Sequence, residues 1–247
     1  MNKRACIIGA VALACIGAGG LSGCGLLPGE TFTDDAKISK KITAIRIDGE
    51  SGSVTVRGGK SGGPDGATAS VHRSVTYRGD RPEGATHRVE GGVLVLGDCG
   101  DDCSASYTVE VPAGLPVSGE TSNGAVNLTK VGAVDVTTSS GAVELDDVSG
   151  TVDVHTSNGR IAGRGLSGTH ITAETSNGEI DLTPATAQNV RAKTSNGGIT
   201  VTVPKGDYRI ATRTTNGSKD ITVPDAPAGR YRLDLTTTNG SITAKSA

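Results

Sequence analysis

Apolar and polar residues alternate on both sides of a four-residue block that recurs through the second half of the chain. The block reads Thr-Ser-Asn-Gly or a close variant, and it occupies residues 121–124, 138–141, 156–159, 175–178, 194–197, 214–217 and 237–240. Val134 and Val136 precede the second block with polar residues between them, and Val143 and Leu145 follow it in the same way. Such alternation is typical of a β-strand with one buried face. Each block therefore joins two predicted strands.

The blocks are spaced as copies of one structural unit. Their glycines follow one another at intervals of 17 to 23 residues, which indicates a repeat architecture. We expect Asn and Gly to supply the positive φ angles of a tight turn at this corner. The predicted corner residues are Asn123, Gly124, Gly141, Asn158, Gly159, Asn177, Gly178, Asn196, Gly197, Asn216, Gly217, Asn239 and Gly240. The opposite corner varies in length, so we expect exposed loops there.

Two all-β architectures fit this pattern. In a single-domain β-solenoid (β-helix-like), each strand pairs with its copy in the next coil, and stacked copies place like residues ~4.8 Å apart. In an antiparallel β meander, each Asn-Gly would form a hairpin turn, for which this dipeptide is a strong signal. We favour the solenoid, because stacking explains why the same four residues recur, whereas a meander has no need of identical turns.

The composition agrees with a thin interior. The chain has 37 Gly, one Phe, four Tyr and no Trp. A conventional globule of this length would use large aromatic side chains to fill its centre. Small aliphatic side chains suffice where the interior is only one or two side chains wide.

The first residues predict an exported, lipid-anchored protein. A basic start is followed by an apolar run that is too short for a comfortable membrane span, as in a secretory signal. The run ends in residues 21–24, Leu-Ser-Gly-Cys, which resemble the bacterial lipobox. We therefore predict a lipoprotein signal peptide over 1–23, lipidation of Cys24 and a flexible tether over 24–41. The alternative is an ordinary signal peptide with an incidental Cys.

Charge and the remaining cysteines narrow the function further. Without residues 1–23 the chain has 22 basic and 26 acidic side chains, and with so few aromatic residues nucleic-acid binding is not expected. Cys99 and Cys103 then remain, and an isolated pair in an exported protein predicts a disulfide. The alternatives are a metal site completed by neighbouring aspartates or a redox pair, but the spacing fits neither.

No catalytic or cofactor motif stands out. The glycines of residues 163–168 match a dinucleotide-binding pattern, but no helix is predicted after them. The histidines, none of which has the spacing of a metal pair, are His72, His87, His155 and His170. Acidic residues share outward slots in two interrupted columns, Asp135, Asp153 and Asp234 in one and Glu144, Asp181 and Asp220 in the other. We interpret both columns as solvated surface, and we predict no enzyme activity, no cofactor and no metal.

The order of short motifs from residue 42 to 244 resembles the bacterial putative-adhesin family, a strand-repeat domain of unknown function. The motifs are residues 45–47, 52–56, 94–96 and 109–114, followed by the corner blocks. The resemblance implies a β-solenoid in an exported or membrane-anchored protein, and it supplies no catalytic residues. The cysteine pair and the lipobox also resemble actinobacterial lipoproteins of this group.

These observations predict one solenoid domain over 42–247, less regular over 42–118 and regular over 119–244. We expect strands at 42–48, 53–57, 69–77, 86–90, 93–96 and 106–111 in the irregular part, which would cover the end of the stack. The favoured function is a non-enzymatic structural or binding module on the outer face of the cell membrane, with a cell-wall glycan or envelope protein as partner. The alternatives are a polysaccharide-active β-helix enzyme and an accessory to an envelope sensor.

Overall fold

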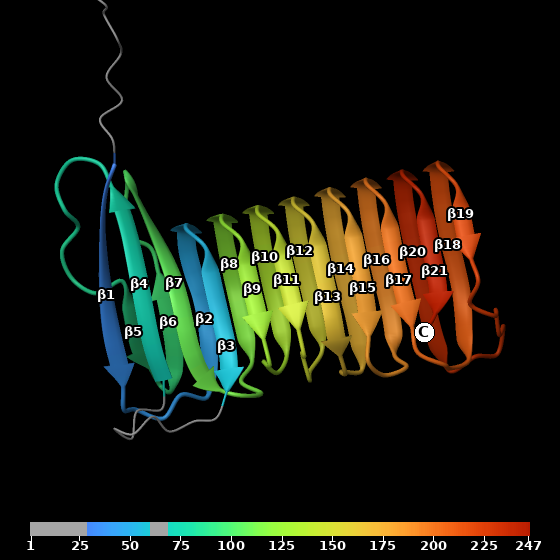
Figure 1. Cartoon of the computed structure of the whole chain (residues 1–247), viewed down its shortest axis with the longest axis horizontal. Helices are drawn as coiled ribbons and strands as arrows, with labels where there is room; N and C mark the ends of the chain where they lie inside the picture. Colours follow the sequence, from blue (N-terminus) through green and yellow to red (C-terminus); the bar gives the residue numbers. More distant parts are fainter. Residues whose placement is uncertain (1–28, 60–68) are drawn as a thin grey trace, which may run out of the picture.

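The computed structural model describes residues 29–59 and 69–247, in which two β-sheets run side by side along a rod (Figure 1). The first sheet contains, in spatial order, β1 (Glu30–Ile38), β4 (Ala69–Tyr77), β7 (Cys103–Pro112), β3 (Val54–Gly59), β9 (Val126–Thr129), β11 (Val143–Asp146), β13 (Ile161–Leu166), β15 (Ile180–Pro184), β17 (Ile199–Val203), β21 (Ile242–Ser246) and β19 (Lys219–Ile221). The second contains β18 (Tyr208–Asn216), β20 (Tyr231–Asn239), β16 (Asn189–Asn196), β14 (His170–Asn177), β12 (Val152–Asn158), β10 (Val134–Ser140), β8 (Val117–Asn123), β2 (Ala44–Ser51), β6 (Val93–Gly97) and β5 (His87–Glu90). Each coil of the chain gives one strand to each sheet.

Neighbouring coils run parallel and in register, which confirms the solenoid and rules out the meander for the repeats. In the second sheet Val134 pairs with Val152, and Val152 pairs with Ile171. In the first sheet Val143 pairs with Ile161 in the same way. All of these side chains are buried, because inward positions of successive coils lie over one another. The core is therefore a stack of small aliphatic layers between the two sheets.

The recurring corner is held by three columns of interactions. Buried threonines donate hydrogen bonds to a glycine carbonyl of the adjacent coil, as Thr175 does to Gly159 at 3.1 Å. The asparagines form a ladder of side-chain hydrogen bonds, with Nδ2 of Asn177 2.9 Å from Oδ1 of Asn158. A Cβ added at Gly178 would lie 2.0 Å from the Gly159 carbonyl oxygen. Since no Cβ fits at that separation, the stack itself requires glycine at the corner.

The prediction that Asn and Gly supply positive φ angles at every corner is partly wrong. No corner Asn has a positive φ, since the described non-glycine residues with positive φ are Asp102, Lys130 and Asp147. Of the seven corner glycines, only Gly124, Gly197 and Gly240 have φ values of 154° to 155°. The corner residues are thus selected mainly by contacts between coils and less by the dihedral angles of a tight turn.

The structure has an eighth corner, which the repeat pattern does not predict. Ser51 at the end of β2 pairs with Asn123, and the Cβ of any residue at position 124 would meet the Gly52 carbonyl oxygen at 2.0 Å. Gly52 therefore belongs to the same column as the predicted glycines. The repeat pattern does not include this corner because Glu50 and Ser51 replace the usual Ser-Asn pair.

The last two coils are stacked out of chain order. Strands β20 and β21 pair with β16 and β17, while the earlier β18 and β19 lie outside them at the end of the rod. The physical reason lies in their inward residues. Leu235 of β20 and Ile242 of β21 are fully buried, whereas the residues paired with them are Thr212 on β18 and Lys219 on β19. The more polar coil, β18 and β19, thus lies at the end of the rod, where it has a neighbouring coil on one side only.

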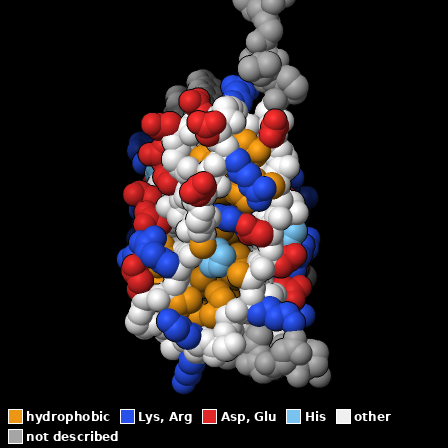
Figure 2. Space-filling view, turned by 90° about the vertical axis from the view of Figure 1, so that its left-hand side faces the viewer, with side chains coloured by type: hydrophobic (Ala, Val, Ile, Leu, Met, Phe, Trp, Pro, Cys, Tyr) orange, Lys and Arg blue, Asp and Glu red, His pale blue; other side chains and the backbone are white. Residues whose placement is uncertain are grey.

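The opposite end is closed by antiparallel strands. Strands β2, β3, β6 and β7 continue the parallel stack, and β1, β4 and β5 then pair antiparallel on its outer side. We name the described residues 29–38 and 69–112 the cap. The flexible tether predicted over 24–41 is wrong for residues 30–38, which form β1. Phe32 there packs against Tyr77 at a ring separation of 5.9 Å. Figure 2 shows this end, with apolar side chains and a histidine in a hollow surrounded by charged groups.

Candidate functional site

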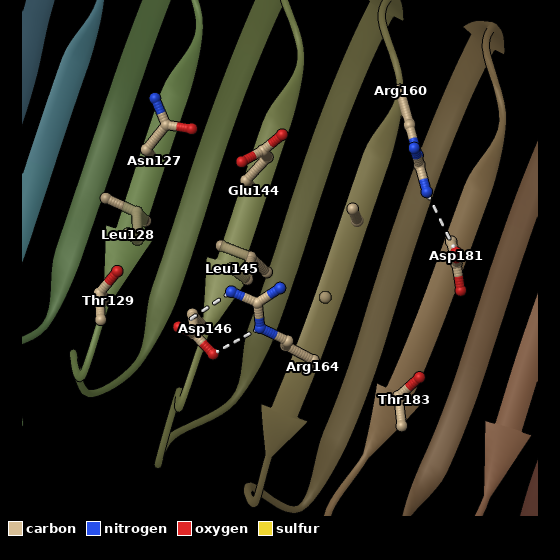
Figure 3. A pocket seen from close by; sticks show the side chains of 12 residues that line it. Asn127, Leu128, Thr129, Glu144, Leu145, Asp146, Arg160, Arg164, Asp181 and Thr183 are labelled. Atoms are coloured by element: carbon tan, nitrogen blue, oxygen red, sulfur yellow. Dashed lines mark hydrogen bonds and ion pairs between the residues drawn. The ribbon is translucent and has the colours of Figure 1, made fainter.

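The outward face of the first sheet has a shallow polar hollow across β9, β11, β13 and β15 (Figure 3). Alternation places Glu144, Ala162 and Asp181 in one row across three adjacent strands. The small Ala162 side chain leaves a depression between its two acidic neighbours. The resulting space measures about 360 Å³ and is open to solvent on its outer side. We name it the first-sheet groove.

Two ion pairs fix the arginines of this groove. The Arg164 guanidinium donates from Nε to Oδ1 of Asp146 at 2.9 Å and from Nη2 to Oδ2 at 3.3 Å. Arg160 donates from Nη2 to Oδ2 of Asp181 at 3.1 Å. The hydrogen bond from Arg164 to Asp146 raises the pKa of Arg164 above its ordinary value. Both pairs are exposed, so they orient polar groups while adding little to stability.

Glu144 differs from the other acids of the groove, because no described residue donates a side-chain hydrogen bond to it. Asn127 lies beside it on β9 at the same level. The Glu144 carboxylate points over the groove in Figure 3 and can accept hydrogen bonds from a ligand. The groove as a whole offers carboxylate and amide acceptors together with guanidinium and amide donors. That mixture suits a hydroxyl-rich ligand.

The arrangement is less suited to acid–base catalysis. Glu144 and Asp181 are two strands apart, so their Cα atoms are separated by ~9.6 Å. A glycosidase needs a pair of carboxyl groups, one of which stays protonated in an apolar environment. Asp181 is instead exposed to solvent and forms an ion pair with Arg160.

The sequence matches one family, described as Toastrack DUF4097, over residues 106–246. The chain belongs to this family. The matched region contains all the regular coils and begins within β7, so β1 to β6 lie outside it. No curated protein matches the chain. The family itself is a domain of unknown function, in agreement with the resemblance noted in the sequence.

Solved structures with similarity to this Toastrack chain include several bacterial proteins. One is a putative adhesin from Bacteroides fragilis, with 15% identity, a TM-score of 0.48, and coverage of 88% of this chain and 97% of the other. Another is a putative cell adhesion protein from Clostridium sporogenes, with 10% identity, a TM-score of 0.39, and coverage of 89% and 100%. At these values the similarity carries no argument about function.

The structure distributes the other predicted site residues along the Toastrack rod. Cys24 lies outside the described residues. Cys99 and Cys103 are joined by a disulfide. The corner residues form a column at one edge of the rod, and none of them lines the first-sheet groove. Among residues 29–59 and 69–247, no group of three His, Cys, Asp or Glu side chains is placed to hold a metal ion. In the same ranges, no helix is long and apolar enough to cross a membrane.

The sequence pattern identifies two acids of the groove, Glu144 and Asp181, but neither Asp146 nor the two arginines. The pattern places Glu144 and Asp181 in one outward column that Ala162 interrupts. That interruption, Ala162, is what forms the floor of the groove. Arg160 and Arg164 flank Ala162 at intervals of two residues, and this alternation was the signal that could have revealed them.

Proposed function

We propose that this chain is a lipid-anchored, extracytoplasmic module that binds hydroxyl-rich polymers of the cell envelope without transforming them. The observation that carries the proposal is the first-sheet groove, a solvent-open row of polar side chains fixed on adjacent rigid strands. A stack of coils presents such side chains at a regular ~4.8 Å spacing, which suits an extended polymer. The Cys99–Cys103 disulfide supports a location in an oxidising compartment.

The binding step is tested with the full-length protein in neutral detergent and insoluble cell-wall glycan. We expect wild type to sediment with the glycan and the Glu144→Ala/Asp181→Ala variant to lose most of this binding, because both walls of the groove are removed. The matched control is Asp135→Ala/Asp153→Ala, which removes two outward acids from the second sheet. Equal binding by wild type and the groove variant would refute the assignment of the groove.

The anchor is tested by growing the producing bacterium with labelled palmitate. We expect label in the wild-type protein and none in Cys24→Ser, because only a thiol can carry the thioether-linked diacylglycerol. Cys15→Ser is the matched control and should remain labelled, since Cys15 lies within the predicted signal peptide. An unlabelled wild-type protein would refute the anchor and leave the binding test unaffected.

A second candidate is a polysaccharide-active enzyme, which the two acids on either side of Ala162 favour. Inverting glycosidases separate their carboxyl groups by about 6.5–9.5 Å. Incubation with cell-wall glycan distinguishes the two functions. Release of new reducing ends that disappears in Glu144→Gln would replace the binding module with the enzyme.

A further inference from the structure

Four arginines gather on the outward face of the second sheet, near the end of the rod remote from the cap. They surround a hollow of about 610 Å³ that also includes His170, Asn189 and Asp234. The four are Arg191 on β16, Arg209 on β18, Arg230 in the loop before β20, and Arg232 on β20. We name this set the arginine cluster.

Strand register places two of these cations directly opposite each other. Arg209 pairs with Arg232 across β18 and β20. The same row continues to Asn189, whose Oδ1 accepts a hydrogen bond from the Arg232 backbone N–H at 2.8 Å, and then to His170. Like charges directly opposite on neighbouring strands destabilise a sheet. The protein therefore carries an unfavourable contact here that a bound anion would relieve.

Acidic groups neutralise only part of the cluster. Arg232 donates to Asp234 at 3.0 Å, and Arg191 donates to Glu174 at 3.0 Å. Arg230 lies 5.6 Å from the Tyr231 ring centroid, and neither Arg230 nor Arg209 has an ion pair with a described acidic residue. The four arginines and their two ion-pair partners together carry a net charge of two positive units.

The two sheets differ in the sign of their polar hollows. In the first-sheet groove, three acids meet two arginines, and each arginine is held by an acid. In the arginine cluster, cations are in excess and two of them are available to a ligand. A hollow lined by one sign of charge concentrates ligands of the opposite sign. Guanidinium groups bind phosphate in a bidentate manner, with more geometric specificity than an ammonium group.

We propose that the arginine cluster binds the phosphate groups of an anionic, phosphodiester-linked envelope polymer. Arg209, Arg230 and Arg232 contact the phosphate oxygens, and Asn189 and His170 extend the polar surface along the same row. The second sheet has ten strands, so at ~4.8 Å per step the cluster lies roughly 40 Å from the cap, where the described chain begins. This position favours a polymer over the membrane surface, an argument that rests on the lipid anchor proposed above.

The test measures binding of the full-length protein, in neutral detergent, to immobilised polyglycerol phosphate and to an uncharged glycan of similar length. Wild type should bind polyglycerol phosphate at least tenfold more tightly than the uncharged glycan. The Arg209→Gln/Arg232→Gln variant should lose this preference, and its binding to the uncharged glycan should equal that of wild type. The matched control Arg160→Gln/Arg164→Gln removes two arginines from the first-sheet groove and should retain phosphate binding. Circular dichroism spectra verify that each variant remains folded.

Three outcomes would overturn the proposal. The first is equal affinity of wild type for the charged and uncharged polymers, and the second is an equal loss of phosphate binding in both double variants. The third is binding to phosphatidylglycerol vesicles as tight as binding to the polymer at the same phosphate concentration, which would assign the cluster to the membrane. Failure here leaves the glycan test of the first-sheet groove intact, because the two sites share no residue.

An independent readout comes from stability at low salt. Arg209→Gln removes one of two opposed cations and should raise the melting temperature of the free protein by a small amount at low ionic strength. The difference from wild type should shrink as salt screens the repulsion. A lower melting temperature for this variant at low salt would contradict the unfavourable contact on which the proposal rests.

Discussion

The regular coils and the cap are built from different kinds of contact. In the coils, corner residues such as Thr175, Thr194 and Asn177 form the same hydrogen bonds to the neighbouring coil, so one pattern is repeated along the rod. In the cap, contacts occur once and join segments far apart in the chain. Arg73, for example, reaches Asp34 on β1 and Thr86 in the loop before β5. Repetition therefore builds the length of the rod, and unrepeated residues close its end.

Arg73 should show the largest effect of any single change in the cap. Its side chain is 6% exposed and donates to Asp34, to the Gly84 carbonyl at 3.0 Å and to Thr86 at 3.1 Å. Arg73→Met leaves these acceptors without their donor, which should cost about 3 kcal/mol or more of unfolding free energy. Urea denaturation measures the loss, and Arg57→Met, an exposed change on β3, should cost little. A stability equal to wild type would show that the cap does not depend on this residue.

A corner glycine should come next in magnitude. Gly178→Ala places a Cβ 2.0 Å from the Gly159 carbonyl oxygen, so two coils must separate. The expected cost is about 3 kcal/mol, as for an overpacked core. Gly198→Ala is the matched control, because the nearest atom to its added Cβ would be 3.5 Å away. If both variants melted at the same temperature, close backbone approach would not explain the glycine column.

The threonine column offers a smaller and sharper comparison. Thr175 donates its hydroxyl to the Gly159 carbonyl, whereas the buried hydroxyl of Thr138 has no hydrogen-bond partner among the described residues. Thr175→Val should destabilise the protein by about 1 kcal/mol, and Thr138→Val should be neutral or stabilising. Thermal denaturation of the two variants side by side measures the difference. Equal losses would mean that the hydrogen bond contributes nothing measurable.

The smallest expected effect is the dependence of the stability of the cap on pH, through His87. Burial lowers the pKa of His87 from its ordinary 6.5, and the nearby Arg73 adds to this shift. The His87 imidazole therefore binds a proton more readily in the unfolded state than in the folded state. Its contribution to folding stability is complete above pH 6.5 and falls as the pH drops toward the folded pKa. Hydrogen exchange of β5 between pH 7.5 and 5 should show this loss, and His87→Gln should reduce it. The same slope in both proteins would exclude His87 as its cause.

The regular coils were predictable because the same physical requirement recurs in every copy. Inward positions must be apolar and corners must fit their neighbours, so the pattern repeats in the sequence as it does in space. The cap lacks such redundancy. Arg73 occupies an inward slot of β4 between the buried Val71 and Val75, and a charge at that position was a signal of a specific partner. That partner, Asp34, lies in a segment without clear periodicity that was expected to be a tether.

The stacking order of the coils at the end of the rod remote from the cap was also only partly predictable from the sequence. Thr212 and Lys219 stand where other coils place apolar residues, which marked this copy as unsuited to an interior place. The pattern could not reveal which later coil would take that place. The first-sheet groove was similarly half predicted, because its acids follow the repeat while its floor depends on one small residue, Ala162.

The reversed order of the last two coils has a consequence for how the protein is completed. The later segment, β20 and β21, supplies the surface on which the earlier β18 and β19 pack. The coil of β18 and β19 therefore cannot pack on the rod until β20 and β21 have been synthesised and have paired with β16 and β17. A chain truncated after residue 230 would lack β20 and β21, and β18 and β19 would then have no strand to pair with. A protease added to this truncated protein should therefore digest it back to the end of β17.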